Sequence, residues 1–371
     1  MSRQALKTFP GRLGLQQRVL PRYRVAFFDA LAQACDRQLS VYAGSPRTQE
    51  AIPQAEMLNE AHFHHGRNLH LFRTPFYVCW QLDLIAWLRN WNPDALIMEA
   101  NPRYPVSRHA IDWMHARGRP VLGWSLGAPE LQGAFGSMRT AVRKRFVNRF
   151  DVMIAYSERG AQEFVRLGYP LDRIVVAANA VAPPPKAQPK RPPLKDRPAR
   201  LIFVGRLQAR KRVDLLLRAC AELERSPGLT IVGDGPERAA LEALARQVFP
   251  SARFSGVLFG DTLQAELDAA DLLILPGTGG LAVQQAMASG LPVIVAEGDG
   301  TQQDLVSGGN GWLIPPGDLT ALVAAVRSAV DHPERLVEMG RRSYNLAVEQ
   351  FNIEVMRDRF VHALSLAREV I

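Results

Sequence analysis

Three glycine-containing turns in the second half of the chain carry residue types that bind phosphate groups. The first turn follows the apolar run ARLIFV and contains Gly205, Arg206 and Lys211. A glycine that ends a strand, followed by cations at the start of a helix, offers backbone amides, a positive helix end and side-chain charge to a diphosphate. A solvated basic turn is the alternative interpretation of this turn taken alone.

Two further turns repeat the order of strand, glycine and helix. In the second, GDGP, Pro236 would open a helix whatever the function. The third, PGTGGL, precedes the helical pattern AVQQAMAS. Glycines let the backbone approach a ligand closely and present several amide donors to an anion. The candidate anion-binding residues of the three turns are Gly205, Gly233, Gly235, Gly277, Thr278, Gly279, Gly280 and Leu281. Three such turns at one sheet edge favour a shared anion site over scaffold alone.

The elements that must position these turns alternate along the whole chain. Short apolar runs such as QLSVYAG, ALIMEA, LTIVGDG and DLLILPG alternate with helical patterns. This alternation predicts parallel sheets with helices on both faces. Ligands of such sheets lie at the carboxyl ends of the strands. The sequence therefore predicts two Rossmann-like doubly wound α/β domains that face a cleft.

Composition indicates a globular protein divided by a linker. The chain has 371 residues, of which 47% are hydrophobic and 22% charged. A proline-rich stretch at 182–200 predicts a semi-rigid linker between a first domain at 1–181 and a second at 201–345. We expect 346–371 to form a C-terminal helix that can pack back on the first domain.

The ends and the cysteines predict a protein that stays in the cytoplasm. No apolar run reaches the roughly 20 residues of a membrane-spanning helix, and the N-terminal stretch lacks the apolar core of a signal peptide. The cysteines Cys35, Cys79 and Cys220 are odd in number and far apart, which disfavours a disulfide framework or a thiolate metal site.

The net excess of positive charge is confined to the first half. Residues 1–180 hold 23 Lys and Arg against 14 Asp and Glu, whereas residues 181–371 hold 22 of each. This asymmetry indicates an anionic surface or partner for the first domain. The segment Phe135 to Phe150 interleaves apolar residues with arginines, which is typical of a helix on an anionic membrane, although a helix packed on the sheet gives the same pattern. No nucleic-acid motif is present, so lipid or glycan is the expected partner.

Several motifs in the second half, in this order, resemble one family. The runs GRLQARKRVDLLL, IVGDGPER, QAMASGLPVI and NGWLIPPGD look like the donor domain of the GT-B-fold glycosyltransferases of family 4. The resemblance extends from Leu201 to Arg342. It implies that Arg206 and Lys211 are the catalytic cations, which clamp the donor diphosphate and neutralise the departing nucleotide. It also implies that the amides of Gly279, Gly280 and Leu281 meet the phosphate and sugar, and that Gln285 faces the ribose.

The chain departs from that family at two glutamates. Family members usually carry two glutamates separated by seven residues, and here Gly277 and Gln285 stand in those places. Glutamine keeps a carbonyl acceptor for a ribose hydroxyl. Glycine has no side chain, so the contact with the donor sugar is lost or made elsewhere.

The resemblance fades in the first half. The stretch YSERGAQEFVRLG, with Ser157 as a helix cap, is similar to the last unit of the family's acceptor domain, but the glycine-rich first turn is absent and PVLGWSLG lacks the usual histidine. Residues that follow predicted strands are the candidates for the acceptor side: Glu99, Asn101, Arg103, Trp124 and Ser125. Loop capping and core packing are their alternative roles. Arg18, Arg22 and Arg24 could bind an anionic acceptor or form a solvated face.

Four histidines invite a metal interpretation: His62, His64, His65 and His70. No nearby carboxylate or cysteine completes a site, so we expect no metal and no cofactor. The chain is thus expected to be a retaining glycosyltransferase that moves a sugar from a nucleotide diphosphate sugar to a hydroxyl of a surface-glycan or lipid-linked acceptor, at the inner face of a membrane. Retention is implied by the resemblance. A non-catalytic partner subunit and a nucleotide-sugar epimerase remain as alternatives.

Overall fold

The computed structural model describes residues 8–50, 52–73, 76–131, 133, 136–187, 189 and 197–370. The chain divides into two compact units. Unit 1 comprises Met1–Val181 and Ile353–Ile371, and unit 2 comprises Ala182–Asn352. Part of the proline-rich stretch, at 188 and 190–196, lies outside the described residues.

Unit 1 is built on a parallel sheet of seven strands in the order β3-β2-β1-β6-β7-β8-β9. Its strands are β1 (Leu13–Gln16), β2 (Leu39–Gly44), β3 (His62–Gly66), β6 (Ala95–Glu99), β7 (Val121–Ser125), β8 (Val152–Ala155) and β9 (Ile174–Val176). The helices around it are α1 (Val25–Gln33), α2 (Leu84–Trp91), α3 (Val106–His115), α4 (Gly136–Val147), α5 (Glu158–Arg166) and α13 (Ile353–Val370).

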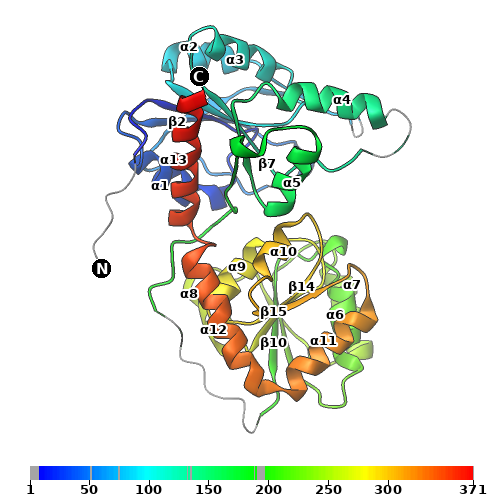
Figure 1. The fold of residues 1–371 in the computed structure, drawn as a ribbon. Coiled ribbons are helices and arrows are strands. Elements are labelled where there is room, and N and C mark those ends of the chain that lie inside the picture. The colour runs from blue at the N-terminus through cyan, green and yellow to red at the C-terminus, as the bar shows by residue number, and fades with distance from the viewer. Residues whose placement is uncertain are drawn as a thin grey trace. The chain divides into compact units, whose positions relative to one another are not determined.

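Two separate cores cover the two faces of this sheet. Along β6, Ala95 and Ile97 join the core formed with α1 and α13, whereas Leu96 and Met98 join the core formed with α2, α3 and α5. Side chains of a strand alternate between the faces, so a strand buried on both faces is apolar throughout. Figure 1 shows helices on both sides of the sheet. Near one edge, the hydroxyl of Ser157 accepts from the Gly160 amide at 3.0 Å, which confirms the predicted helix cap.

A two-stranded antiparallel sheet, which the sequence did not predict, lies beside the main sheet of unit 1. It consists of β4 (Asn68–Leu71) and β5 (Val78–Gln81), and residues 68–73 and 76–81 are called the hairpin below. Phe72, Arg73 and Phe76, between the two strands, are called its tip. Residues 74 and 75 lie outside the described residues.

Unit 2 holds a second parallel sheet, in the order β12-β11-β10-β13-β14-β15. Its strands are β10 (Arg200–Val204), β11 (Gly228–Val232), β12 (Arg253–Gly256), β13 (Leu272–Leu275), β14 (Val293–Ala296) and β15 (Gly311–Ile314). Its helices are α6 (Val213–Ala221), α7 (Arg238–Val248), α8 (Gly260–Ala269), α9 (Leu281–Ala288), α10 (Thr301–Leu305), α11 (Leu319–Asp331) and α12 (Pro333–Glu349). The strand order reverses between β10 and β13, and ligands of open α/β sheets bind at such a reversal. The prediction of two doubly wound α/β domains is confirmed.

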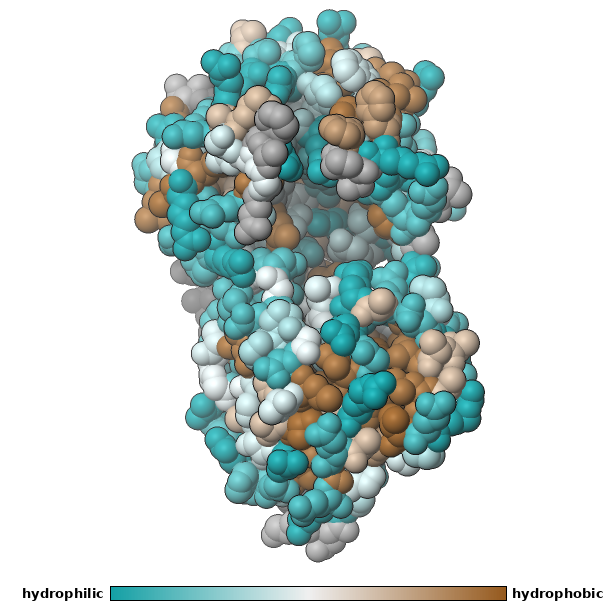
Figure 2. Space-filling view, turned by 90° about the vertical axis from the view of Figure 1, so that its right-hand side faces the viewer, coloured by the Kyte–Doolittle hydropathy of each residue, from teal (hydrophilic) through white to brown (hydrophobic). Residues whose placement is uncertain are grey.

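Hydrophilic residues cover most of the face seen in Figure 2, and hydrophobic residues gather on it in patches. Among the described helices, none combines the length and apolar character needed to cross a membrane.

Candidate active site

The first and third glycine turns meet at the carboxyl ends of β10 and β13. Residues 205–212 form the clamp turn and residues 277–281 form the glycine loop. The Thr278 amide donates to the Arg210 carbonyl at 3.1 Å, and the Arg210 guanidinium reaches the Thr278 hydroxyl at 3.0 Å. Lys211 Nζ donates to the Thr278 carbonyl at 2.6 Å. Two segments far apart in sequence are therefore tied together at the strand reversal.

Glycine is required in the glycine loop by this close approach. A Cβ on Gly277 would lie 2.6 Å from Lys211 Cα and would also collide with the Arg210 carbonyl. Gly279 has a φ of +142°, and its Cβ would collide with the Lys211 ammonium. The space that a glutamate at position 277 would need is filled by clamp-turn backbone. The glycine at position 277 thus fits this packing of backbone on backbone.

The second turn braces the clamp turn. The Gly205 amide donates to Val232 at 3.0 Å, and a Cβ on Gly233 would run into the Gly205 carbonyl. A Cβ on Gly235 would run into the Leu207 carbonyl, which accepts from the Glu237 amide at 3.1 Å. Gly233 and Gly235 are therefore needed for the second turn to pack on the backbone of the clamp turn, which carries the cations.

The two predicted cations differ in their surroundings. Arg206 is exposed. Lys211 is half-buried, and this burial together with the neighbouring Arg210 charge lowers the pKa of its ammonium to about 8. A bound anion would stabilise the charged form of Lys211 strongly, because its negative charge would offset both the cost of burial and the repulsion from Arg210.

The amides of the glycine loop lead into α9. Gly280 is the residue before the helix, Leu281 is its first residue, and Gln285 is partly exposed one turn later. The positive end of α9 therefore adjoins Lys211. The buried side chain of Gln302 supports the loop by donating to the Gly279 carbonyl at 3.0 Å. The sequence reasoning missed Gln302, because nothing in a lone glutamine at the start of a short helix indicates that contact.

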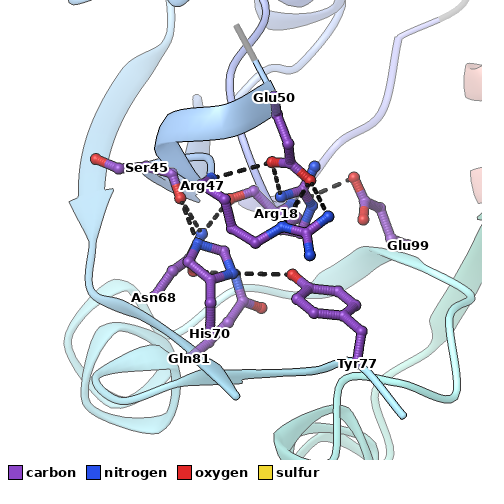
Figure 3. A network of polar contacts seen from close by, with 9 residues as sticks. All are labelled: Arg18, Ser45, Arg47, Glu50, Asn68, His70, Tyr77, Gln81 and Glu99. Atoms are coloured by element: carbon purple, nitrogen blue, oxygen red, sulfur yellow. Dashed lines mark hydrogen bonds and ion pairs between the residues drawn. The ribbon is translucent and has the colours of Figure 1, made fainter. Parts of the chain in front are cut away.

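In unit 1, the carboxyl edge of the sheet holds a network of polar side chains (Figure 3). The Glu99 carboxylate accepts from the Arg18 amide at 3.2 Å, and the Arg18 guanidinium pairs with Glu50 at 2.7 Å. Arg47 also pairs with Glu50, at 3.0 Å. Burial alone would raise the pKa of Glu50, but the two arginines outweigh it and lower that pKa. At Glu99 burial outweighs the neighbouring cations, so the pKa of Glu99 is raised.

The hairpin supplies the rest of this network. His70 Nε2 lies 3.0 Å from the Ser45 carbonyl and Nδ1 lies 2.9 Å from the Tyr77 hydroxyl. A carbonyl can only accept, so Nε2 carries a proton, and in the neutral ring Nδ1 accepts from Tyr77. Buried Gln81 bonds to Gln16 at 2.6 Å. The network is thus continuous from the sheet to the hairpin.

The prediction that Trp124 lies in the acceptor site was wrong. This residue was expected beside the acceptor, but its side chain is 1% exposed and packs edge-on against Phe360 of α13. Its position in β7 points it into the core that α1 and α13 share. Arg24 is also buried, with its guanidinium 4.1 Å from the Trp124 ring and 3.0 Å from the Tyr156 hydroxyl, so it belongs to neither a solvated face nor an open acceptor site.

The other candidates of the acceptor side remain at the sheet edge. Asn101 accepts from the Arg103 amide at 3.1 Å, and the Ser125 hydroxyl lies 3.4 Å from the Gly127 carbonyl, so both side chains cap loops. Arg103 and Arg22 are exposed. An open groove of about 490 Å³ lies between α4 and α5 and is lined by Arg143 and Arg159 among others.

The basic segment Phe135 to Phe150 is not one amphipathic stripe. Phe146 and Phe150 are buried in the core, whereas Met138 and Val142 are exposed with the arginines. Phe135 lies outside the described residues. Packing on the sheet, which was the alternative interpretation, therefore describes the C-terminal part of α4.

The histidines bond to separate partners. His62 contacts Gln38, and His64 stacks on Tyr42. His64 Nε2 also lies 3.4 Å from the Asp83 carboxylate, so the expectation that no carboxylate lies near these histidines was wrong. Among the described residues, no group of three or more His, Cys, Asp or Glu side chains could hold a metal ion.

Two family models match the chain one after the other. The model "Glycosyltransferase Family 4" matches residues 25–183, and "Glycosyl transferases group 1" matches residues 186–346. The motifs that suggested this resemblance lie within the second match. This chain belongs to the family 4 glycosyltransferases.

Similar proteins agree with this membership. The chain is 28% identical over 288 residues to the glycogen synthase of Mycobacterium tuberculosis, in a match that covers 71% of this chain and 66% of that protein, just under two thirds. It is 25% identical over 356 residues to the lipopolysaccharide core biosynthesis glycosyltransferase LpsE of Rhizobium meliloti, which covers 93% and 95% of the two chains.

Solved structures share the fold. The lipopolysaccharide outer core galactosyltransferase WaaB, in its apo form, has a TM-score of 0.69 at 17% identity, and Anabaena HepE in complex with UDP has a TM-score of 0.70 at 17% identity. Each match covers 95% of this chain and 99% of the other. These neighbours establish the GT-B fold of the family 4 member described here.

Proposed function

We propose that this family 4 member is a retaining glycosyltransferase that moves a sugar from a nucleotide diphosphate sugar to a hydroxyl group of its acceptor. The observation that carries the proposal is the junction of the clamp turn and the glycine loop, where half-buried Lys211 adjoins a row of backbone amides at the strand reversal. The neighbour HepE has been solved with UDP and with UDP-glucose, which is the kind of donor proposed.

The chemistry proposed for this junction is stabilisation of the leaving group. As the bond between sugar and diphosphate breaks, negative charge grows on the phosphate oxygen. Arg206 and Lys211 neutralise that charge, and the amides of residues 279–281 donate to it. Removal of one such preorganised donor typically costs about 3 kcal/mol in the transition state. The proposal needs no metal or cofactor, and retention rests on family membership.

The proposed acceptor is a surface glycan or a lipid-linked saccharide, with the protein peripheral at the inner face of a membrane. The relative LpsE is named for lipopolysaccharide core biosynthesis, and WcaL of Escherichia coli, 27% identical over 235 residues, is named for colanic acid biosynthesis. The groove between α4 and α5 is lined by three arginines and two glutamates, and Arg159 pairs with Glu163 at 3.4 Å. The remaining arginines, Arg143 and Arg166, are the groups proposed to meet an anionic part of such an acceptor.

The proposal is tested by offering the purified protein a panel of nucleotide diphosphate sugars. Thermal stabilisation by one of them, followed by release of nucleoside diphosphate when candidate acceptors are added, is the expected result. If no nucleotide sugar raises the melting temperature or yields nucleoside diphosphate, the enzyme proposal is wrong.

Gly277 favours a second candidate, a non-catalytic partner subunit. The residue cannot contact a donor sugar through a side chain, and its environment leaves no room for one. Such a protein would bind the nucleotide sugar in the same panel, but it would release no nucleoside diphosphate with any acceptor.

A further inference from the structure

The hairpin presents its polar face to the protein and its apolar face to solvent. The pairs Leu69 with Trp80 and Leu71 with Val78 share the outer face, because side chains alternate along each strand. The inner face carries Asn68, His70 and Gln81, which bond to the network around Arg18 and Ser45 (Figure 3). A surface hairpin normally buries its apolar face, so this orientation is inverted.

The outer face and the tip expose large apolar side chains. They are Leu69, Phe72, Phe76, Trp80 and Leu82. Phe72 is 72% exposed and Phe76 is 77% exposed. Phe72 also has a φ of +59°, an unfavourable conformation for a residue with a Cβ. An aromatic surface of this kind indicates an interaction site.

The positive charge in and beside the hairpin indicates an anionic partner. Residues 61–82 contain Arg67 and Arg73 and no Asp or Glu. Asp83, the next acid along the chain, is turned inward and accepts from the Tyr42 hydroxyl at 2.6 Å. Arg103 adds a further exposed cation beside the hairpin, where its carbonyl accepts from the Cys79 amide at 3.0 Å. Three exposed arginines, Arg67, Arg73 and Arg103, therefore lie in or beside the hairpin.

We propose that the hairpin inserts its aromatic tip into the interface of a lipid bilayer that contains anionic lipids. Phenylalanine and tryptophan enter the boundary between headgroups and acyl chains, while arginines beside them bind anionic headgroups. A second copy of this chain is a poor occupant, because it would bring the same cations to the contact. The inference rests on the proposed function in one respect, since a lipid-linked acceptor is presented at such a surface.

The experiment measures binding of the full chain to vesicles by co-sedimentation. Vesicles of phosphatidylcholine with phosphatidylglycerol as the minor lipid are compared with vesicles of phosphatidylcholine alone. The expected result is binding to the anionic vesicles that weakens with salt. The double variant Phe72→Ser, Phe76→Ser should lose roughly tenfold or more in vesicle affinity. The variant Phe259→Ser, which changes a phenylalanine of unit 2 that is 78% exposed, is the matched control and should bind as the wild type does.

A second measurement covers misfolding of the double variant. Lipids brominated on their acyl chains should quench the fluorescence of Trp80 in the wild-type protein, and the quenching should fall in Trp80→Leu. Equal vesicle binding by wild type and double variant, or no binding by the wild type, overturns the proposal. The proposal is also overturned, in favour of a second copy as the partner, if the wild type is a dimer without lipid and the double variant is a monomer. Nucleotide-sugar binding is measured without vesicles, so failure of the proposed function is detected separately.

Discussion

The carboxyl edges of the two sheets are built in different ways. In unit 2 the glycines at the edge bring backbone segments into close contact. The Lys211 ammonium at this edge donates to the Thr278 carbonyl. In unit 1 the edge consists of long side chains, and the cations Arg18 and Arg47 are already paired with Glu50. The difference teaches that the proposed diphosphate site in unit 2 depends on backbone shape, whereas the edge of unit 1 depends on a chain-specific set of side chains.

The largest effect on stability is expected from adding a methyl group to the glycine loop of unit 2. Gly277→Ala should lower the free energy of unfolding by about 2–3 kcal/mol, because overpacking forces the Arg210 and Lys211 backbone to move. Nucleotide-sugar affinity should fall with it. Denaturant unfolding and calorimetry measure the two effects.

Gly280→Ala is the matched control for stability. A Cβ there would meet its nearest neighbour, Leu305, at 3.4 Å, which is an ordinary contact. Equal stability of Gly277→Ala and Gly280→Ala would contradict the claim that the clamp turn and the glycine loop are packed backbone on backbone.

A smaller effect, confined to unit 1, is expected from Glu50→Gln. The change leaves Arg18 and Arg47 without their shared carboxylate and should cost about 1–2 kcal/mol of stability. Nucleotide-sugar affinity should stay at the wild-type value. Glu56→Gln, at an exposed carboxylate of the same unit, should leave stability unchanged. Loss of donor affinity in Glu50→Gln would break the separation of roles between the two edges.

The smallest effect is a pH dependence of donor binding. Burial lowers the pKa of Lys211 to about 8, so the free protein loses this cation as pH rises through 8. A bound diphosphate favours the protonated form, and affinity should therefore fall about tenfold between pH 7 and pH 9. Lys211→Arg keeps its charge over this range and should remove the dependence. An affinity that rises with pH would contradict this role of Lys211.

The sequence predicted the two α/β units because fully buried strands are apolar and alternate with helices. It also predicted that the glycine turns lie at one sheet edge, because backbone contacts of this kind tolerate few residue types. It could not show that Gly277 packs on Lys211, because that contact depends on β10 lying beside β13.

Predictions for unit 1 were weaker for physical reasons. Trp124 lies in a strand that is mostly apolar, and such a pattern does not show on which face of the sheet a side chain lies. Its side chain proved to be buried. The hairpin escaped prediction because its apolar residues face outward. Side-chain networks such as that of Arg18 and Glu50 join residues with no regular spacing.

The most direct test of the central claim is calorimetric titration of the wild type and of the variant Arg206→Ala, Lys211→Ala with the nucleotide sugar that the panel identifies. We expect a measurable dissociation constant for the wild type and no detectable binding by the variant, with the variant still folded in a thermal melt. Equal affinity of the two proteins would contradict the assignment of the diphosphate site to the clamp turn.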